Sequence, residues 1–126
     1  MLFRSALLGK PITVYGTGEQ TRSFTDVKDV VHAITRLMSE PRAEGDVFNV
    51  GNDHEVSINE LAARVKEMTG SPSEIEHLSY EKAYGPGFED MERRCPNISK
   101  IRDLIGFEPA RDLDAIIQGV IDYFKA

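Results

Sequence analysis

The sequence predicts a small α/β domain in which a few short strands form a sheet flanked by helices. Short runs of β-branched and aromatic residues alternate with longer stretches whose apolar residues recur at helical spacing. The strands are too short and too few for a full doubly wound sheet. The chain contains no internal repeat, low-complexity segment or linker, so we expect a single unit over residues 1–126.

The first half of the chain is expected to contain two helices and three strands. Residues 1–8 are typical of the last turns of a helix that ends at Gly9. A protein rarely begins halfway along a helix, so we expect this chain to be part of a longer one. Asp26 is expected to cap a helix whose apolar stripe packs on a core. That stripe is Val27, Val30, Val31, Ile34, Leu37 and Met38, and the three strands are ITVY (12–15), QTRSF (20–24) and DVFNV (46–50).

The second half is expected to contain three further helices. SINE at residues 57–60 is a capping box with Ser57 at the N-cap, and it starts a helix that stops at Gly70. The remaining expected segments are a strand at 75–78, a loop at 84–92, a short helix capped by Asn97 and a last helix capped by Asp112.

Composition argues against several classes of protein. The net charge is −6, whereas a general nucleic-acid binder needs a basic face. No apolar run approaches the roughly 20 residues of a membrane span, and His32, His54 and His77 stand too far apart for a metal motif. The single cysteine, Cys95, excludes an internal disulfide and indicates a reducing, cytoplasmic location.

The segment YGTGEQTRSF at residues 15–24 has two glycines of a dinucleotide-binding loop but lacks the rest of that motif. The motif needs three glycines between a strand and a helix. Here Thr21 stands in place of the third glycine, and the following residues favour a strand. We therefore interpret Gly16-Thr17-Gly18 as a turn between two strands.

Arg22 and Arg94 are the candidate anion-binding residues. An arginine between two small hydroxyl residues beside a turn presents a fork that suits a phosphate or a carboxylate. The alternative for Arg22 is a solvated side chain or one paired with Asp26 or Asp29. Two arginines on separate elements suit a diphosphate, and the alternative for Arg94 is a surface ion-pair cluster with neighbouring acids.

No catalytic residue is predicted within the chain. The patterns GxSxG and TyrxxxLys do not occur, since Tyr80, Tyr84 and Tyr123 each lack a lysine four residues on. Cys95 has basic neighbours but no histidine near it in sequence, and we interpret it as a passive small residue. Taken alone, the residues indicate a binding module and not a complete catalyst.

Motifs along essentially the whole chain resemble one known family. YGTGEQTRSF is followed by TDVKDVVHAI, FNVGN, SINELA, RRCPNISKI and IGFEP. In these motifs, their order and their approximate spacing, the chain resembles the C-terminal part of the extended short-chain dehydrogenases that act on nucleotide sugars. These include UDP-glucose 4-epimerases, dTDP-glucose 4,6-dehydratases and UDP-glucuronate decarboxylases. The resemblance implies a small substrate-binding lobe that is normally attached to an NAD-binding Rossmann domain.

The resemblance also implies a site for the nucleotide end of a nucleoside-diphosphate sugar. The implied binding residues are Thr13, Val14 and Tyr15 beside the base, Arg22 at the phosphates or ribose, Ser57 near the nucleotide and Arg94 at the diphosphate. These roles agree with the diphosphate interpretation of the two arginines.

The chain departs from the family pattern at three places. Asn97 replaces an aspartate after the proline and caps a helix without adding charge, and Thr17 replaces the aspartate of a YGDG turn. Epimerases and several dehydratases have an arginine before a Pro-Gly pair in the late loop. Gly85 stands there, before Pro86 and Gly87, which favours the decarboxylase-like branch.

The family's NAD loop, its tyrosine–lysine pair and its serine or threonine would lie upstream of residue 1. Hydride transfer needs all of them. We therefore expect NAD in the full-length family enzyme, none bound to this chain alone, and no activity without a Rossmann portion or another subunit. The alternatives are a stand-alone, non-enzymatic binding or interaction module and an inactive truncated fragment.

Overall fold

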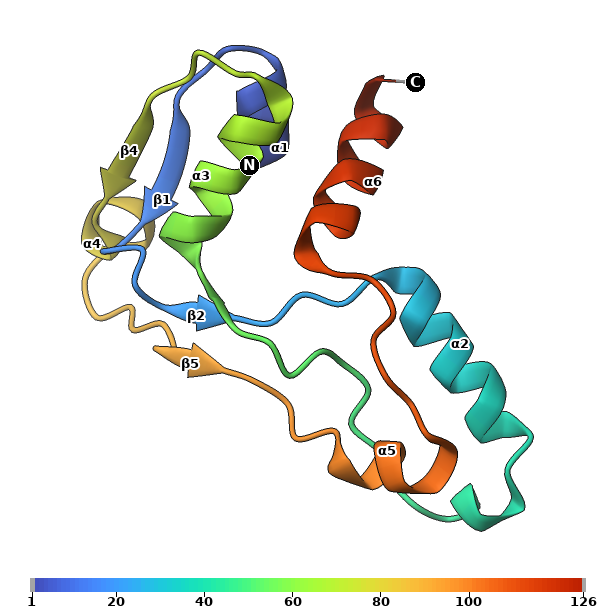
Figure 1. Ribbon diagram of the computed structural model, residues 1–126. Helices are drawn as coiled ribbons and strands as arrows, with labels where there is room; N and C mark the ends of the chain where they lie inside the picture. The colour runs from blue at the N-terminus through green and yellow to red at the C-terminus, as the bar shows by residue number, and fades with distance from the viewer. Residues whose placement is uncertain (1, 126) are drawn as a thin grey trace. The chain divides into compact units, whose positions relative to one another are not determined.

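A computed structural model describes residues 2–125, which group into two compact units. The first unit combines residues 2–22, 56–94 and 117–125, and the second combines residues 23–55 and 95–116. Helices and short strands alternate along the chain (Figure 1), which confirms the predicted α/β class. That residues 1–126 act as one nucleotide-sugar-binding unit stays a prediction.

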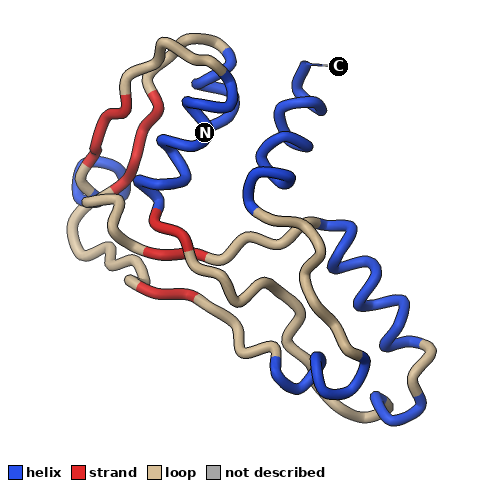
Figure 2. Tube along the Cα trace, viewed as in Figure 1, coloured by secondary structure: helices blue, strands red, loops and turns tan. Residues whose placement is uncertain are grey.

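The first unit contains a two-stranded parallel sheet covered by helices. Strand β1 (Ile12–Tyr15) pairs with β4 (Ile75–Leu78), and the two strands lie side by side in Figure 2. Helices α1 (Leu2–Leu7) and α3 (Ile58–Thr69) pack against each other and against β1. Side chains alternate between the faces of a strand, so every second residue of β1 enters the core. The core residues are Ile12, Val14, Ala6, Leu61, Ala62 and Val65.

A second sheet in the same unit has three very short strands. Its order is β3 (Val56–Ser57), β2 (Thr21–Arg22) and β5 (Arg93–Arg94), with β2 antiparallel to β3 and parallel to β5. The expected strand at 20–24 is therefore shorter than its pattern indicates. Its partner β5 and the helix α4 (Tyr80–Tyr84) were not expected from the sequence. The turn at 16–18 links two different sheets.

The second unit is built on helix α2 (Val27–Met38) and helix α5 (Ser99–Ile105), with a 3-10 turn at Pro41–Ala43. Its core joins residues from both helices with others from the segments between them. The core residues are Ala33, Ile98, Ile101, Ile105 and Phe107, with Leu37, Phe48, Val50 and Leu104 packed against them.

The apolar stripe expected on α2 is only partly correct. Ala33 and Leu37 face the core, whereas Val31 is 56% and Met38 84% exposed. The expected strand at 46–50 is not formed either. Its alternate apolar residues Phe48 and Val50 do pack on the core, but within residues 2–125 no strand pairs with the segment. An alternating pattern of apolar residues indicates which side chains are buried, but a strand forms only where a neighbouring strand is present for hydrogen bonding.

The predicted helix caps are mostly confirmed. Asp26, Ser57 and Asp112 accept backbone N–H groups from Lys28, Glu60 and Ala115. Asn97 accepts from Ser99 N at 2.9 Å, although α5 begins one residue later than expected. The last helix, α6, runs over Leu113–Lys125, and Ile117 and Ile121 on it are buried. None of the helices in residues 2–125 has the length and apolar character needed to cross a membrane.

Candidate functional site

The three-stranded sheet gathers three of the expected binding residues. Arg22 lies opposite Arg94 in the parallel β2–β5 pair, and Thr21 lies opposite Ser57 in the antiparallel β2–β3 pair. Neighbouring strands lie about 4.8 Å apart. Arg22, Ser57 and Arg94 are therefore close in space although they are far apart in sequence.

Arg22 is the most firmly held of these residues. Its side chain is only 19% exposed, and its Nη2 donates to Asp90 Oδ2 at 2.7 Å. Its Nη1 donates to the carbonyl oxygens of Thr21 and Met91, at 2.7 and 2.8 Å. An ion pair of Arg22 with Asp26 or Asp29 is thus not formed. The acid that pairs with Arg22 comes from the late loop.

Arg22 lines a cavity of about 340 Å³ in the first unit. Two more of the expected residues, Thr13 and Tyr15, line the same cavity, and its other walls are mainly aromatic. Tyr84 and Phe88 stack with their ring centroids 4.4 Å apart, and Tyr15 lies 5.5 Å from Tyr84. The cavity thus combines an arginine fork with flat apolar surfaces, which suits a ligand that carries both an anionic group and a ring.

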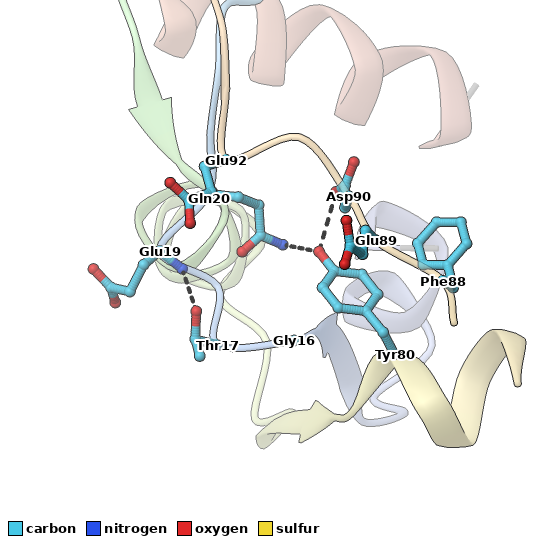
Figure 3. Close-up of a pocket in the computed structure, with 9 residues that line it drawn as sticks. All are labelled: Gly16, Thr17, Glu19, Gln20, Tyr80, Phe88, Glu89, Asp90 and Glu92. Carbon is cyan, nitrogen blue, oxygen red and sulfur yellow. Dashed lines mark hydrogen bonds between the residues drawn. The ribbon is translucent and has the colours of Figure 1, made fainter. Parts of the chain in front are cut away.

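Tyr80 connects this cavity to its neighbour. Gln20 Nε2 donates to the Tyr80 hydroxyl at 2.9 Å, and the hydroxyl donates to Asp90 Oδ2 at 3.0 Å (Figure 3). Burial of the phenol, followed by its hydrogen bond to Asp90, raises the pKa of Tyr80. Sequence reasoning missed Gln20, Tyr80 and Asp90, because none stands in a pattern that signals binding.

The neighbouring cavity is larger, about 870 Å³, but its charge is wrong for a phosphate. Four carboxylates line it, those of Glu19, Glu89, Asp90 and Glu92 (Figure 3). The other lining residues are Gly16, Thr17, Gln20, Tyr80 and Phe88. No lysine or arginine is among its lining residues. Like charges repel, so the smaller cavity, which Arg22 lines, is the better candidate for an anion.

The other expected binding residues occupy different positions. Val14 is fully buried, so its side chain belongs to the core, and it is not among the residues that line the cavity. Ser57 accepts from Glu60 N at 3.1 Å and caps α3. Arg94 is exposed on β5. Neither Ser57 nor Arg94 lines the 340 Å³ cavity.

The Gly16-Thr17-Gly18 turn is held by side chains and is not a phosphate loop. Asn59 Nδ2 donates to Thr17 O at 3.0 Å, and Asn59 Oδ1 lies 2.8 Å from His77 Nε2. Both glycines have positive φ, and a Cβ at Gly18 would overlap the Asn59 side chain. The chain then enters β2. Because no helix N-terminus follows, the turn has no ring of free N–H groups for a pyrophosphate.

No metal centre is apparent in the described part of the chain. Within residues 2–125, no group of three or more His, Cys, Asp or Glu side chains is placed to hold a metal ion. Cys95 is a free, partly buried thiol whose Sγ lies 3.5 Å from Asp53 O.

The fold and the motifs define the class of protein. A family model described as the NAD dependent epimerase/dehydratase family matches residues 1–51. Similar sequences and solved structures extend the match over nearly the whole chain. The chain is therefore similar to members of this family along nearly its whole length.

Two curated relatives of this chain are decarboxylases. The chain is 37% identical over 122 residues to a UDP-N-acetyl-alpha-D-glucosaminuronate decarboxylase of Bacillus cytotoxicus, and the match covers 97% of this chain and 38% of the relative. It is 38% identical over 120 residues to UDP-glucuronic acid decarboxylase 1 of Xenopus tropicalis, covering 95% of this chain and 27% of that protein. The chain therefore spans between about a quarter and two fifths of the relatives' length.

Two solved structures share the fold at 26–27% identity. The UDP-glucose 4-epimerase of Thermotoga maritima, with UDP-glucose, aligns with a TM-score of 0.86 over 98% of this chain and 38% of its own. The UDP-glucuronic acid 4-epimerase of Bacillus cereus, in complex with UDP-glucuronic acid and NAD, aligns with a TM-score of 0.82 over the same shares.

Proposed function

We propose that this chain is the nucleotide-sugar-binding part of an NAD-dependent sugar epimerase, dehydratase or decarboxylase. One observation carries the proposal: Thr13, Tyr15 and Arg22, all expected to contact the ligand, line one cavity. In this proposal the diphosphate lies against the Arg22 fork. Arg94, next to Arg22 across the β2–β5 ladder, supplies a second positive charge.

The relatives support a UDP-sugar as the ligand. Solved structures of similar chains hold UDP-glucose or UDP-glucuronic acid, and the two curated relatives are named as decarboxylases of UDP-linked uronic acids. Gly85 in the late loop, where epimerases have an arginine, favours the same decarboxylase-like branch. We therefore propose a UDP-linked uronic acid as the substrate class.

We propose that this chain by itself does not hold NAD. The glycines at 16 and 18 lie in a turn that leads into β2, and the side chains of Tyr80 and Asn59 occupy the space above them. NAD supplies the hydride acceptor in this family. We propose that a Rossmann portion or another subunit holds it, while this chain binds and orients the sugar nucleotide.

The proposal is tested by titrating the protein with UDP and following its NMR signals. Arg22→Ala is expected to weaken UDP binding by about 1.5–3 kcal/mol, the usual loss for a hydrogen bond to a charged group. That corresponds to a decrease of roughly tenfold to 150-fold. Arg22→Lys keeps the charge but not the fork, and we expect an intermediate loss.

The matched control is Arg64→Ala on α3. Arg64 also forms an ion pair, with Glu67 Oε2 at 2.7 Å, but it is more exposed and does not line the cavity. Its replacement is expected to leave UDP binding unchanged. Equal losses in the Arg22 and Arg64 variants, or no binding of UDP by the unaltered protein, would contradict the proposed function.

A further inference from the structure

The anion position on Arg22 is already filled by a carboxylate of the chain itself. Asp90 Oδ2 accepts from Arg22 Nη2 at 2.7 Å and from the Tyr80 hydroxyl at 3.0 Å. One oxygen atom thus receives two hydrogen bonds, one from a cation and one from a neutral donor. This arrangement also suits a single phosphate oxygen.

The two donors are held in place without Asp90. Arg22 Nη1 donates to the carbonyl oxygen of its own strand neighbour, Thr21, and Gln20 Nε2 donates to the Tyr80 hydroxyl. Gln20 is itself anchored, because its Nε2 also donates to Tyr15 O at 2.9 Å. Departure of Asp90 would leave two oriented donors that face the same point.

Asp90 belongs to a loop that has two glycines at its start and is held by the Phe88 ring on Tyr84 and by Met91 O on Arg22. The loop that follows α4 contains Gly85 and Gly87, with φ values of +90° and +85°, and no atom outside their immediate chain neighbours lies within 4 Å of a Cβ built at either glycine. Glycine rotates through these conformations at little cost. The Asp90 side chain is 32% exposed, so water can replace its contacts when it leaves.

We propose that Asp90 is an internal occupant of the diphosphate site, and that a phosphate oxygen of the ligand displaces it and binds between Arg22 and Tyr80. This inference rests on the proposed function. It adds Tyr80 as a ligand-binding residue and the loop at 85–92 as a segment that must move before the site fills. Asp90 and a diphosphate do not share Arg22, because their charges repel each other.

The first test compares UDP affinities of Asp90→Asn, Glu89→Gln and the unaltered protein. When Asp90 occupies the site, UDP cannot bind there, so the apparent UDP affinity equals the affinity of the open site multiplied by the fraction of molecules in which the site is open. If about a tenth are open, Asp90→Asn is expected to strengthen UDP binding about tenfold. Glu89→Gln removes the same charge from the same loop but lies outside the Arg22 cavity, and its affinity is expected to change less than twofold.

The second test measures the contribution of Tyr80 without the competing carboxylate. In the Asp90→Asn background, Tyr80→Phe removes only the hydroxyl that would bind the phosphate oxygen. We expect this double variant to bind UDP about tenfold more weakly than Asp90→Asn alone. An unchanged affinity would overturn the role of Tyr80.

A third measurement detects the contact between Asp90 and Arg22 in the absence of nucleotide. Nitrogen NMR of the Arg22 guanidinium is expected to show restricted Nη2 rotation in the unaltered protein and in Glu89→Gln and free Nη2 rotation in Asp90→Asn, while Nη1 stays held by the carbonyl oxygens of Thr21 and Met91. Free rotation in all three would overturn the proposal, and so would equal gains in UDP affinity for Asp90→Asn and Glu89→Gln. Weaker UDP binding by Asp90→Asn would show that Asp90 positions Arg22 for the ligand.

Failure of the inference and failure of the proposed function give different results. If no variant binds UDP, the proposed function fails, and the displacement of Asp90 fails with it. If Arg22→Ala alone loses UDP binding and Asp90→Asn binds as the unaltered protein does, the proposed function stands and the displacement is wrong.

Discussion

Gly18 holds the turn that delivers Arg22 to the cavity. Its φ is +78°, and a Cβ would overlap Asn59 Oδ1, the atom that contacts His77. We therefore expect Gly18→Ala to lower the free energy of unfolding by about 2–3 kcal/mol, through backbone strain together with the clash. Urea unfolding followed by circular dichroism measures this change.

Gly9→Ala is the matched control for Gly18→Ala. Gly9 also has positive φ, at +65°, and lies in the same unit, but nothing lies within 4 Å of its Cβ position. Its substitution carries the backbone strain alone, about 1 kcal/mol. Equal losses at the two positions would show that Asn59 moves aside at no cost.

Arg22 illustrates how far prediction reaches for a single residue. A strand, a turn and two hydroxyl neighbours identify it as a candidate for anion binding. Its partner Asp90 is 68 residues away in sequence, in a loop without periodicity. Local patterns carry no information about such a contact. Tyr80 escaped prediction for the same reason.

At the scale of the element, α2 is fastened at its first turn by Asp29. This buried carboxylate accepts from the backbone N–H groups of Ala110 and Arg111 at 3.1 Å each, and from Arg111 Nη1 at 2.5 Å. We expect Asp29→Ala to lower the free energy of unfolding by about 2–3 kcal/mol, since it leaves two amides and a guanidinium without their acceptor.

The control for Asp29→Ala is Asp103→Ala, on α5 of the same unit. Asp103 is exposed, and an exposed substitution of this kind changes stability by about 0.5 kcal/mol or less. Thermal unfolding of both variants at pH 7 compares them. Similar losses for the two aspartates would contradict a specific fastening role for Asp29.

Elements were predicted well where their signals are local and less well where they are not. Asp26, Ser57 and Asp112 each accept a hydrogen bond from a backbone N–H no more than three residues away, and the sequence predicts these caps correctly. The segment at 46–50 has the alternation of a strand but no neighbour to pair with. The stripe on α2 is wider than its buried face. Which apolar residues are covered depends on what packs there.

At the scale of the whole molecule, several ion pairs make stability depend on acidity. Hydrogen bonds from Arg42 lower the pKa of Glu40 from 4.5 to about 2, and the pKa values of Asp46 and Asp53 are lowered by Lys100 and Arg102. A carboxylate with a lowered folded-state pKa stabilises the fold above its unfolded-state pKa. That stabilisation is lost as the pH falls through the folded-state pKa.

We therefore expect stability to hold above about pH 5 and to fall between about pH 4.5 and pH 2. The difference in stability between the unaltered protein and Glu40→Gln should be constant at neutral pH and vanish towards pH 2. Because Glu40 is near the surface, 1 M salt should reduce the difference. A difference that keeps its full neutral-pH size at pH 2 would rule out the ion pair as its cause.

The sequence by itself determined the α/β class, the caps and boundaries of most helices, the turn before Arg22 and the family motifs. These features depend on residues within a few positions of one another, where backbone geometry and hydrogen bonding are local. Only the tertiary structure decided that β1 pairs with β4, that Arg94 lies beside Arg22, and that Asp90 occupies the Arg22 fork. These contacts join segments far apart in the chain, and packing of the whole unit selects them.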